Sequence, residues 1–149
     1  MILGVAVLVV ILLMLVVASP IFNPTGNSTS SVLSPVTVTK STCDRQPGFV
    51  LIIADLSGFN DSIGHGAPIN PWPIVRVEKG QVVRFLVCNT DETQAHGFAI
   101  AYYFDAGIAI KPGEAYTIVF TATEAGNFAI FCNIFCTIHI FMRGELIVS

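Results

Sequence analysis

The sequence predicts an all-β domain, an antiparallel sandwich or barrel, preceded by one N-terminal transmembrane helix. After residue 48, roughly seven short runs rich in β-branched and aromatic residues follow one another at intervals of about 8–12 residues. Gly, Pro and Asn separate these runs, and no run shows the 3.6-residue period of apolar positions that a helix would require. Residues 2–18 differ, because they form one unbroken apolar stretch.

The apolar stretch, ILGVAVLVVILLMLVVA, contains no charged residue. A bilayer is spanned by about 20 apolar residues, with about 17 as the lower limit, so residues 1–20 predict a membrane anchor. A cleavable signal peptide is the alternative, since Val16 and Ala18 fit a small-residue cleavage pattern. The absence of Lys and Arg before the apolar run favours the anchor. Both interpretations place the rest of the chain on the extracytoplasmic face of the cell membrane.

Residues 21–42 are rich in Ser, Thr, Pro, Asn and Gly, a composition that predicts a polar tether. The folded domain is therefore expected over residues 43–149. Two glycosylation tripeptides, at Asn27 and Asn60, are compatible with an external location. Only 11% of the residues are charged, against about 25% in an average soluble domain. With a net charge of −3 and no basic stripe, the chain is not expected to bind nucleic acid.

The expected strands follow in order along the folded part. Residues 49–55 are rich in β-branched side chains, whereas residues 56–73 carry several prolines and glycines and predict a loop. Further strands are expected on both sides of the turn at residues 78–80, over 96–103, on both sides of the turn at 111–113, and over 128–131 and 145–148.

The loop expected between the last two strands carries an unusual set of polar atoms. Cys132, Cys136, His139 and Met142 lie there among Ile and Phe. Thiolate, imidazole and thioether ligands favour copper or zinc over calcium or magnesium. The last three of these residues recur at every third position, which lets a tight loop direct them to one point. His96, one of three histidines in the chain, opens a strand after a polar turn and is the candidate for a further ligand.

These residues carry a resemblance to the cupredoxins over residues 74–149. The Cys-x3-Cys spacing and the runs AHGF, KPGE and AGNFAIFCNIFC resemble the CuA domain of cytochrome c oxidase subunit II. The order of anchor, tether and domain is similar to the same family. The run CTIHIFMRG resembles instead the loop of amicyanin, a mononuclear blue-copper protein. Both resemblances imply an antiparallel Greek-key β-sandwich, with residues 43–149 as the copper-binding domain.

The two resemblances imply different ligand sets. The CuA resemblance implies two coppers bridged by two cysteines, each copper held by one histidine, with a methionine as weak ligand and a backbone carbonyl as the remaining contact; these residues would be Cys132, Cys136, His96, His139, Met142 and Ile134. The amicyanin resemblance implies one copper held by His96, Cys136 and His139, with Met142 as the long axial ligand and Cys132 as a buried neighbour. The CuA loop normally has three residues between its second cysteine and its histidine, whereas here there are only Thr137 and Ile138.

Both ligand sets imply single-electron transfer. The first hypothesis is the subunit II role in a haem–copper terminal oxidase, which accepts electrons from an external donor protein and passes them to subunit I of the respiratory chain enzyme. The second is a free-standing, membrane-tethered type 1 copper carrier, and the third is a zinc-bound or metal-free structural β-sandwich. No nucleophile–base–acid set or phosphate loop is present, so no catalytic site and no small-molecule substrate are expected on this chain.

Several further expectations concern single side chains. Phe98, Phe131, Phe135 and Phe141 are expected to exclude water from the metal. Ile138, Ile140 and Phe141 flank His139 and form either the end of the core or the docking rim that cupredoxins present. His65 is expected at the surface, Trp72 in the core, and Asp91 and Glu92 in a solvated turn. A disulfide between Cys43 and Cys88 stays open, because sequence does not give their separation.

Overall fold

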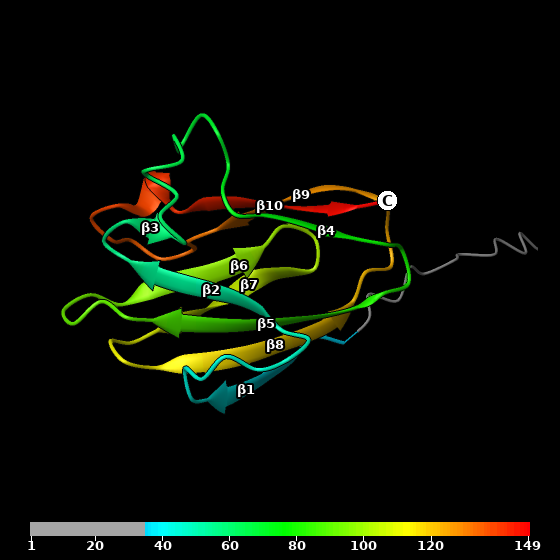
Figure 1. Cartoon of the computed structure of the whole chain (residues 1–149), viewed down its shortest axis with the longest axis horizontal. Helices are drawn as coiled ribbons and strands as arrows, with labels where there is room; N and C mark the ends of the chain where they lie inside the picture. The colour runs from blue at the N-terminus through cyan, green and yellow to red at the C-terminus, as the bar shows by residue number, and fades with distance from the viewer. Residues whose placement is uncertain (1–34) are drawn as a thin grey trace, which may run out of the picture. The chain divides into compact units, whose positions relative to one another are not determined.

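The computed structural model describes residues 35–149, so the expected membrane anchor and most of the expected tether lie outside the described residues. Within this part of the chain, ten strands form two five-stranded sheets (Figure 1). In the order of their pairing, the first sheet contains β1 (Thr37–Ser41), β8 (Ala115–Thr121), β5 (Val82–Asn89), β2 (Val50–Asp55) and β3 (Gly58–Phe59). The second contains β4 (Ile74–Val77), β10 (Arg143–Val148), β9 (Gly126–Phe131), β6 (His96–Ile100) and β7 (Phe104–Ile110).

The prediction of a purely antiparallel sandwich is wrong in two places. Strand β2 runs parallel to β5, and β4 runs parallel to β10. The chain leaves the first sheet after β3 and enters the second at β4, so each sheet receives strands that are not joined by hairpins. Side-chain alternation is the same in both pairings, and the sequence pattern therefore could not distinguish them.

The core lies between the two sheets and is dominated by phenylalanine. Phe85 from β5 and Phe98 from β6 pack with ring centroids 5.6 Å apart, and Phe59 meets Phe98 edge-on at 5.8 Å. All three side chains are fully buried. Burying one such side chain contributes about 1.5–3 kcal/mol, so contacts between the sheets hold the fold together.

Strand pairing begins earlier than the sequence analysis expects. Residues Thr37–Ser41 belong to the expected tether, yet they form β1 and pair with β8 from Thr37↔Val119 to Ser41↔Ala115. Three β-branched residues open this strand and favour the extended backbone. Because β1 is an exposed edge strand, it has no apolar face that would reveal it in the sequence.

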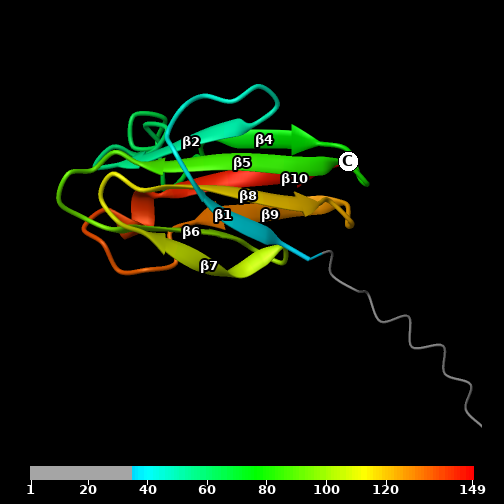
Figure 2. The ribbon, with the colours of Figure 1, turned by 90° about the horizontal axis from the view of Figure 1, so that it is seen from below.

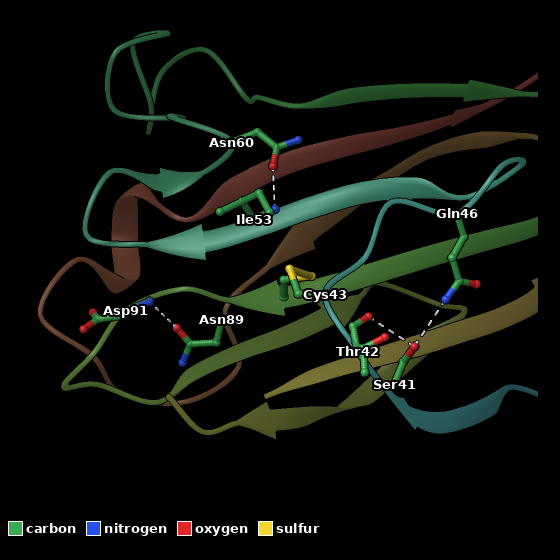
Figure 3. Close-up of a disulfide and its surroundings, with 9 residues drawn as sticks. Ser41, Thr42, Cys43, Gln46, Ile53, Asn60, Asn89 and Asp91 are labelled. Carbon is green, nitrogen blue, oxygen red and sulfur yellow. Dashed lines mark hydrogen bonds between the residues drawn. A yellow bond between two sulfur atoms is a disulfide. The ribbon is translucent and has the colours of Figure 1, made fainter. Parts of the chain in front are cut away.

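A disulfide between Cys43 and Cys88 fastens the segment after β1 to the end of β5 (Figure 3). The two Cα atoms are 5.6 Å apart, within the usual range for a disulfide. The bond closes a loop with a sequence separation of 45 residues. The question that the sequence left open is therefore answered by the fold.

The long loop between β3 and β4 is ordered by its own side chains. The Asn60 side chain accepts a hydrogen bond from the Ile53 N–H and donates one to the Leu51 carbonyl. The Trp72 indole N–H donates to the Asn60 carbonyl at 3.0 Å. Both ends of the Asn60 amide are thus used within the fold, and its glycosylation tripeptide has a structural role.

Two aromatic residues of this loop stack on each other. The rings of His65 and Trp72 are 4.1 Å apart. His65 is exposed, as predicted, whereas Trp72 is half-buried and not the core residue that was expected. The indole N–H of Trp72 finds its hydrogen-bond partner, the Asn60 carbonyl, within the loop, which holds the side chain there. Over residues 35–149, the structure contains no helix of the length and apolarity that a bilayer crossing requires.

Candidate metal centre

The ligand-type side chains of the last loop meet at one end of the sandwich. The loop runs from the end of β9 to the start of β10 and lies beside β3 in Figure 1. Figure 2 shows it at the same end as the turns that follow β5 and β7. One ligand atom each from Cys132, Cys136 and His139 lies within 4.8 Å of the others.

Three sulfur atoms form a continuous buried row in this loop. The Cys132 and Cys136 Sγ atoms are 3.7 Å apart, and the Cys136 thiol lies 3.7 Å from the Met142 Sδ atom. All three side chains are buried, Met142 completely. The cysteines are both free thiols. The predicted loop therefore directs its soft ligands inward, to one point.

Backbone hydrogen bonds close the loop around these sulfurs. The Cys132 N–H donates to the Met142 carbonyl at 3.3 Å, which joins the two ends of the loop. The His139 N–H donates to the Cys136 carbonyl at 3.2 Å, and residues His139–Phe141 form a short 3₁₀ helix. This single turn brings the ring of His139 and the sulfur of Met142 to the side of the loop where Cys136 lies.

Strand β6 supplies a hydrogen bond to the first sulfur. The Gly97 N–H donates to the Cys132 Sγ atom at 3.1 Å, a contact that stabilises a thiolate. Gly97 is needed here, because a Cβ atom at this position would lie 2.7 Å from the Asn133 backbone nitrogen and 2.9 Å from that of Ile134. The start of β6, and with it His96, is thus held against the metal loop.

His139 and the Ile134 carbonyl are also neighbours. The His139 Nδ1 atom lies 2.8 Å from the Ile134 oxygen, and the Cys132 thiol donates to the same oxygen at 3.2 Å. His139 is half-buried, so one edge of its ring meets solvent. The two residues that the CuA resemblance implies as ligands of the same centre are therefore in contact.

His96 is fully buried and has one ring nitrogen without a partner. Its Nε2 atom lies 3.0 Å from the Asp91 carboxylate, while no hydrogen-bond partner within residues 35–149 reaches its Nδ1 atom. His96 does not belong to the close cluster of Cys132, Cys136 and His139. An unsatisfied buried polar atom costs about 1–3 kcal/mol, which a metal ion bound at Nδ1 would remove. The free Nδ1 atom thus makes His96 a candidate for a further metal ligand from a second segment of the chain.

Asp91 is the site residue that the sequence analysis missed. It was expected in a solvated turn, but only 6% of its surface is exposed. Burial alone would raise the pKa of Asp91, yet hydrogen bonds from the Thr93 and Gln94 backbone, the Thr93 hydroxyl and His96 lower it to about 2. Its signal in the sequence was its place five residues before a candidate metal ligand, because metal-binding histidines commonly donate their other ring nitrogen to a carboxylate.

The second cysteine is a protonated thiol at neutral pH in the absence of metal. Burial raises the pKa of Cys136 to about 11, and the neighbouring Cys132 adds to this effect. A metal ion binds the thiolate and must displace this proton. The pocket therefore disfavours a Cys136 thiolate on its own, and it accepts the thiolate when a bound cation neutralises the negative charge.

The expected aromatic shell is present in part. Phe98 is fully buried, and Phe131 and Phe141 are half-buried. The expectation for Phe135 is wrong, since 95% of its surface is exposed. Its neighbour Cys136 points into the pocket, which turns the adjacent side chains of Phe135 and Thr137 outward. Ile140 is also exposed, while Ile138 and Phe141 are half-buried around His139.

The donor set limits the metal to a few ions. Two thiols, imidazole nitrogens and a thioether are ligands that copper and zinc prefer, and within residues 35–149 the close cluster around the sulfurs includes no carboxylate of the kind that calcium or magnesium prefers. The residues that would hold the ion are Cys132, Cys136, His139 and Met142, with His96 through Nδ1 and the Ile134 carbonyl beside them.

Comparison with known proteins identifies the fold. Residues 71–148 match the family model of the cupredoxin-like domain. Similar solved structures include a mutant of amicyanin in its Cu(I) form, 20% identical, with 76% of this chain and 98% of that chain covered and a TM-score of 0.49. Reduced auracyanin from Roseiflexus castenholzii is 18% identical, with coverages of 70% and 99% and a TM-score of 0.51.

A third similar structure is the copper-containing nitrite reductase of Thermus scotoductus, 13% identical, with a TM-score of 0.52; the similarity covers 70% of this chain and 32% of that chain. At such identities the similarities extend to the fold. No curated protein sequence matches the chain. The family model, however, covers more than half of the chain, and copper is the metal that this fold and the cysteine–histidine set hold. The chain belongs to the cupredoxin-like domain family and is a cupredoxin-type copper electron-transfer protein.

Proposed function

We propose that this protein is the copper-bearing subunit II, or a subunit II-like protein, of a haem–copper terminal oxidase. In this proposal the side chains of Cys132, Cys136, His96, His139 and Met142, together with the Ile134 carbonyl, would hold two coppers in one centre. Residues 1–20 anchor the chain in the cell membrane with the copper domain on the extracytoplasmic face, and the residues before β1 tether it.

The observation that carries the proposal is the distance of 3.7 Å between the Cys132 and Cys136 sulfurs. A mononuclear blue-copper site uses one thiolate. Here a second thiol is buried in the same pocket, faces the first, and receives a hydrogen bond from the Gly97 N–H. Burial and the neighbouring thiol of Cys132 raise the pKa of Cys136, which means that the Cys136 thiolate is disfavoured in this pocket. A second metal ion would neutralise the negative charge of two thiolates and so offset this free-energy penalty.

The chain's own residues suit electron transfer and not bond-making. Copper supplies a one-electron couple when bound. Three neighbouring strands of one sheet, β10, β9 and β6, carry the proposed ligands at or next to their ends, and the buried Phe98 limits the access of water. Exclusion of water reduces solvent rearrangement and tunes the potential. The external donor docks, in this proposal, around the exposed edge of His139, where Ile140 and Phe135 are exposed.

A mononuclear carrier is the second candidate function, and one observation favours it. Only Thr137 and Ile138 separate Cys136 from His139, and the Cys136 thiol touches the Met142 sulfur at 3.7 Å. Cys136, His139 and Met142 can therefore surround a single copper together with His96. Cys132 would then bind no metal and would be a buried neighbour whose sulfur accepts the hydrogen bond from the Gly97 N–H.

Copper titration of the purified full chain separates the two candidates. Two coppers per chain with a purple, mixed-valence spectrum support the subunit II role. One copper with an intense blue band supports the mononuclear carrier and overturns the binuclear proposal. A colourless protein that retains zinc against copper would overturn both. Co-purification of the full chain with a haem-bearing membrane subunit then tests the assembly into an oxidase.

A further inference from the structure

We propose that Asp91 is a positioning residue, which fixes the His96 ring in the tautomer whose Nδ1 atom is free to bind copper. The proposal rests on the ligand role of His96 in the proposed function and holds for one copper or two. It concerns the contact of 3.0 Å between the His96 Nε2 atom and one oxygen of Asp91.

The hydrogen-bonding capacity of the two groups decides the tautomer. An ionised carboxylate only accepts hydrogen bonds, so the Nε2 atom of His96 must be the donor. A neutral imidazole carries one proton, and the Nδ1 atom therefore keeps a free lone pair. That atom is buried and has no partner within the described part of the chain. Among residues 35–149, Asp91 is the one hydrogen-bond partner of Nε2, so it is the group that keeps the proton away from the metal-binding nitrogen.

The Asp91 carboxylate is itself held in place by hydrogen bonds, and its two oxygens have different partners. One oxygen of Asp91 accepts from the Thr93 N–H, the Thr93 hydroxyl and the Gln94 N–H at 2.8–3.1 Å. The other oxygen is left for His96.

Asn89 connects this turn to the sheets. The Asp91 N–H donates to the Asn89 side-chain oxygen at 2.9 Å, a bond drawn in Figure 3. The Asn89 amide donates in turn to the Gln94 carbonyl and to the Ile110 carbonyl of β7. The turn therefore cannot shift without breaking bonds to two strands, and the orientation of the His96 ring is fixed through Asp91 by the fold.

The substitution Asp91→Asn separates tautomer control from a merely structural role. The amide oxygen of this variant can keep the three turn bonds, which places its NH₂ group opposite His96. A donor then faces Nε2, and the imidazole proton has to move to Nδ1. The opposite amide orientation would set the NH₂ group against the Thr93 and Gln94 N–H groups and lose both of those hydrogen bonds.

Nuclear magnetic resonance of the full chain, labelled with ¹⁵N only in histidine, measures the tautomer in the metal-free protein. The chain has three histidines, so His96 is resolved against His65 and His139. The wild type is expected to carry the proton on Nε2 and the Asp91→Asn variant on Nδ1. Affinity for Cu(I), measured by competition with a chelator, should fall by about 10–100-fold in the variant.

Glu92→Gln is the matched control. Glu92 is the next residue along the chain, is exposed, and lines the same surface cleft of about 430 Å³ as Asp91. The substitution Glu92→Gln removes one negative charge, as Asp91→Asn does. This variant should keep the wild-type tautomer and affinity. Unchanged signals of His65 and His139 will show that Asp91→Asn remains folded.

Three results would overturn the proposal. A wild-type His96 protonated on Nδ1 would do so without any variant, even if Asp91→Asn failed to fold. So would an Asp91→Asn variant that binds Cu(I) as tightly as Glu92→Gln. The third is an Asp91→Asn variant whose His96 keeps its proton on Nε2, because Asp91 would then not set the tautomer. The copper count of the wild type is independent of these results and tests the proposed function separately.

Discussion

The Ser62 hydroxyl donates a hydrogen bond of 2.7 Å to the Phe141 carbonyl, and so fastens the loop after β3 to the metal loop. The same hydroxyl accepts from the Phe59 N–H at 3.1 Å. Ser62 is completely buried. Two segments that are 79 residues apart in the sequence thus share one side chain beside the candidate copper centre.

Replacing this residue tests how much the contact stabilises the domain. Ser62→Ala leaves the Phe59 N–H and the Phe141 carbonyl without partners, which should lower the free energy of unfolding by about 1–3 kcal/mol. Urea unfolding of the metal-free protein measures the change. Ser57→Ala, at an exposed position in the turn between β2 and β3, is the control and should change stability by less than about 0.5 kcal/mol. Equal effects of the two variants would contradict the role given to Ser62.

The close approach of β6 to the metal loop predicts a specific defect in Gly97→Ala. The new methyl group would clash with the Asn133 and Ile134 backbone, so the metal loop must move away from β6, which lengthens the hydrogen bond from the Gly97 N–H to Cys132. Overpacking of this kind costs about 1–3 kcal/mol, and the copper spectrum should change together with the stability. Gly113→Ala is the control: its φ of +72° makes alanine strained there, but its Cβ would meet no atom within 4 Å, so this variant should lose stability and leave the copper spectrum unaltered. A normal copper spectrum in Gly97→Ala would refute this packing argument.

The disulfide is expected to stabilise the domain mainly through the unfolded chain. For a loop with a sequence separation of 45 residues, the chain-entropy relation gives about 4 kcal/mol. The double variant Cys43→Ser, Cys88→Ser should unfold at correspondingly lower urea concentration. A reductant should lower the stability of the metal-free wild type to the same extent and leave the double variant unchanged. If reductant had no effect on the wild type, the bond would not contribute.

Asp91 predicts a loss of stability in acid. Its pKa is lowered by folding from 3.8 to about 2, so the folded state holds the ionised form more strongly than the unfolded chain does. This contribution is complete above about pH 4 and is lost as the pH falls through about 2. Urea unfolding between pH 5 and pH 2 should therefore show a steeper fall for the wild type than for Asp91→Asn. Parallel curves would mean that Asp91 does not titrate as described.

The strands and the metal loop could be predicted because their signals are local. Runs such as residues 49–55 are rich in β-branched side chains, and the spacing of Cys136, His139 and Met142 lies within one loop. His96 was identified by the scarcity of histidine. The predicted turns at residues 78–80 and 111–113 are confirmed as the connections between β4 and β5 and between β7 and β8.

What the sequence could not predict depends on tertiary packing. The direction of pairing between β2 and β5 and the bond between Cys43 and Cys88 are set by how distant segments meet. Asp91 looked like an ordinary turn residue, and only its placement against β6 buries it. Phe135 looked like part of the shell, but its direction follows from the inward direction of Cys136.

The central claim is that both buried cysteines bind copper in one centre, and electron paramagnetic resonance of the copper-loaded Cys132→Ser variant tests it most directly. The account predicts that the wild type holds two coppers that share one unpaired electron, and that Cys132→Ser loses this shared signal. A wild type with one copper and a signal that Cys132→Ser retains would contradict the account.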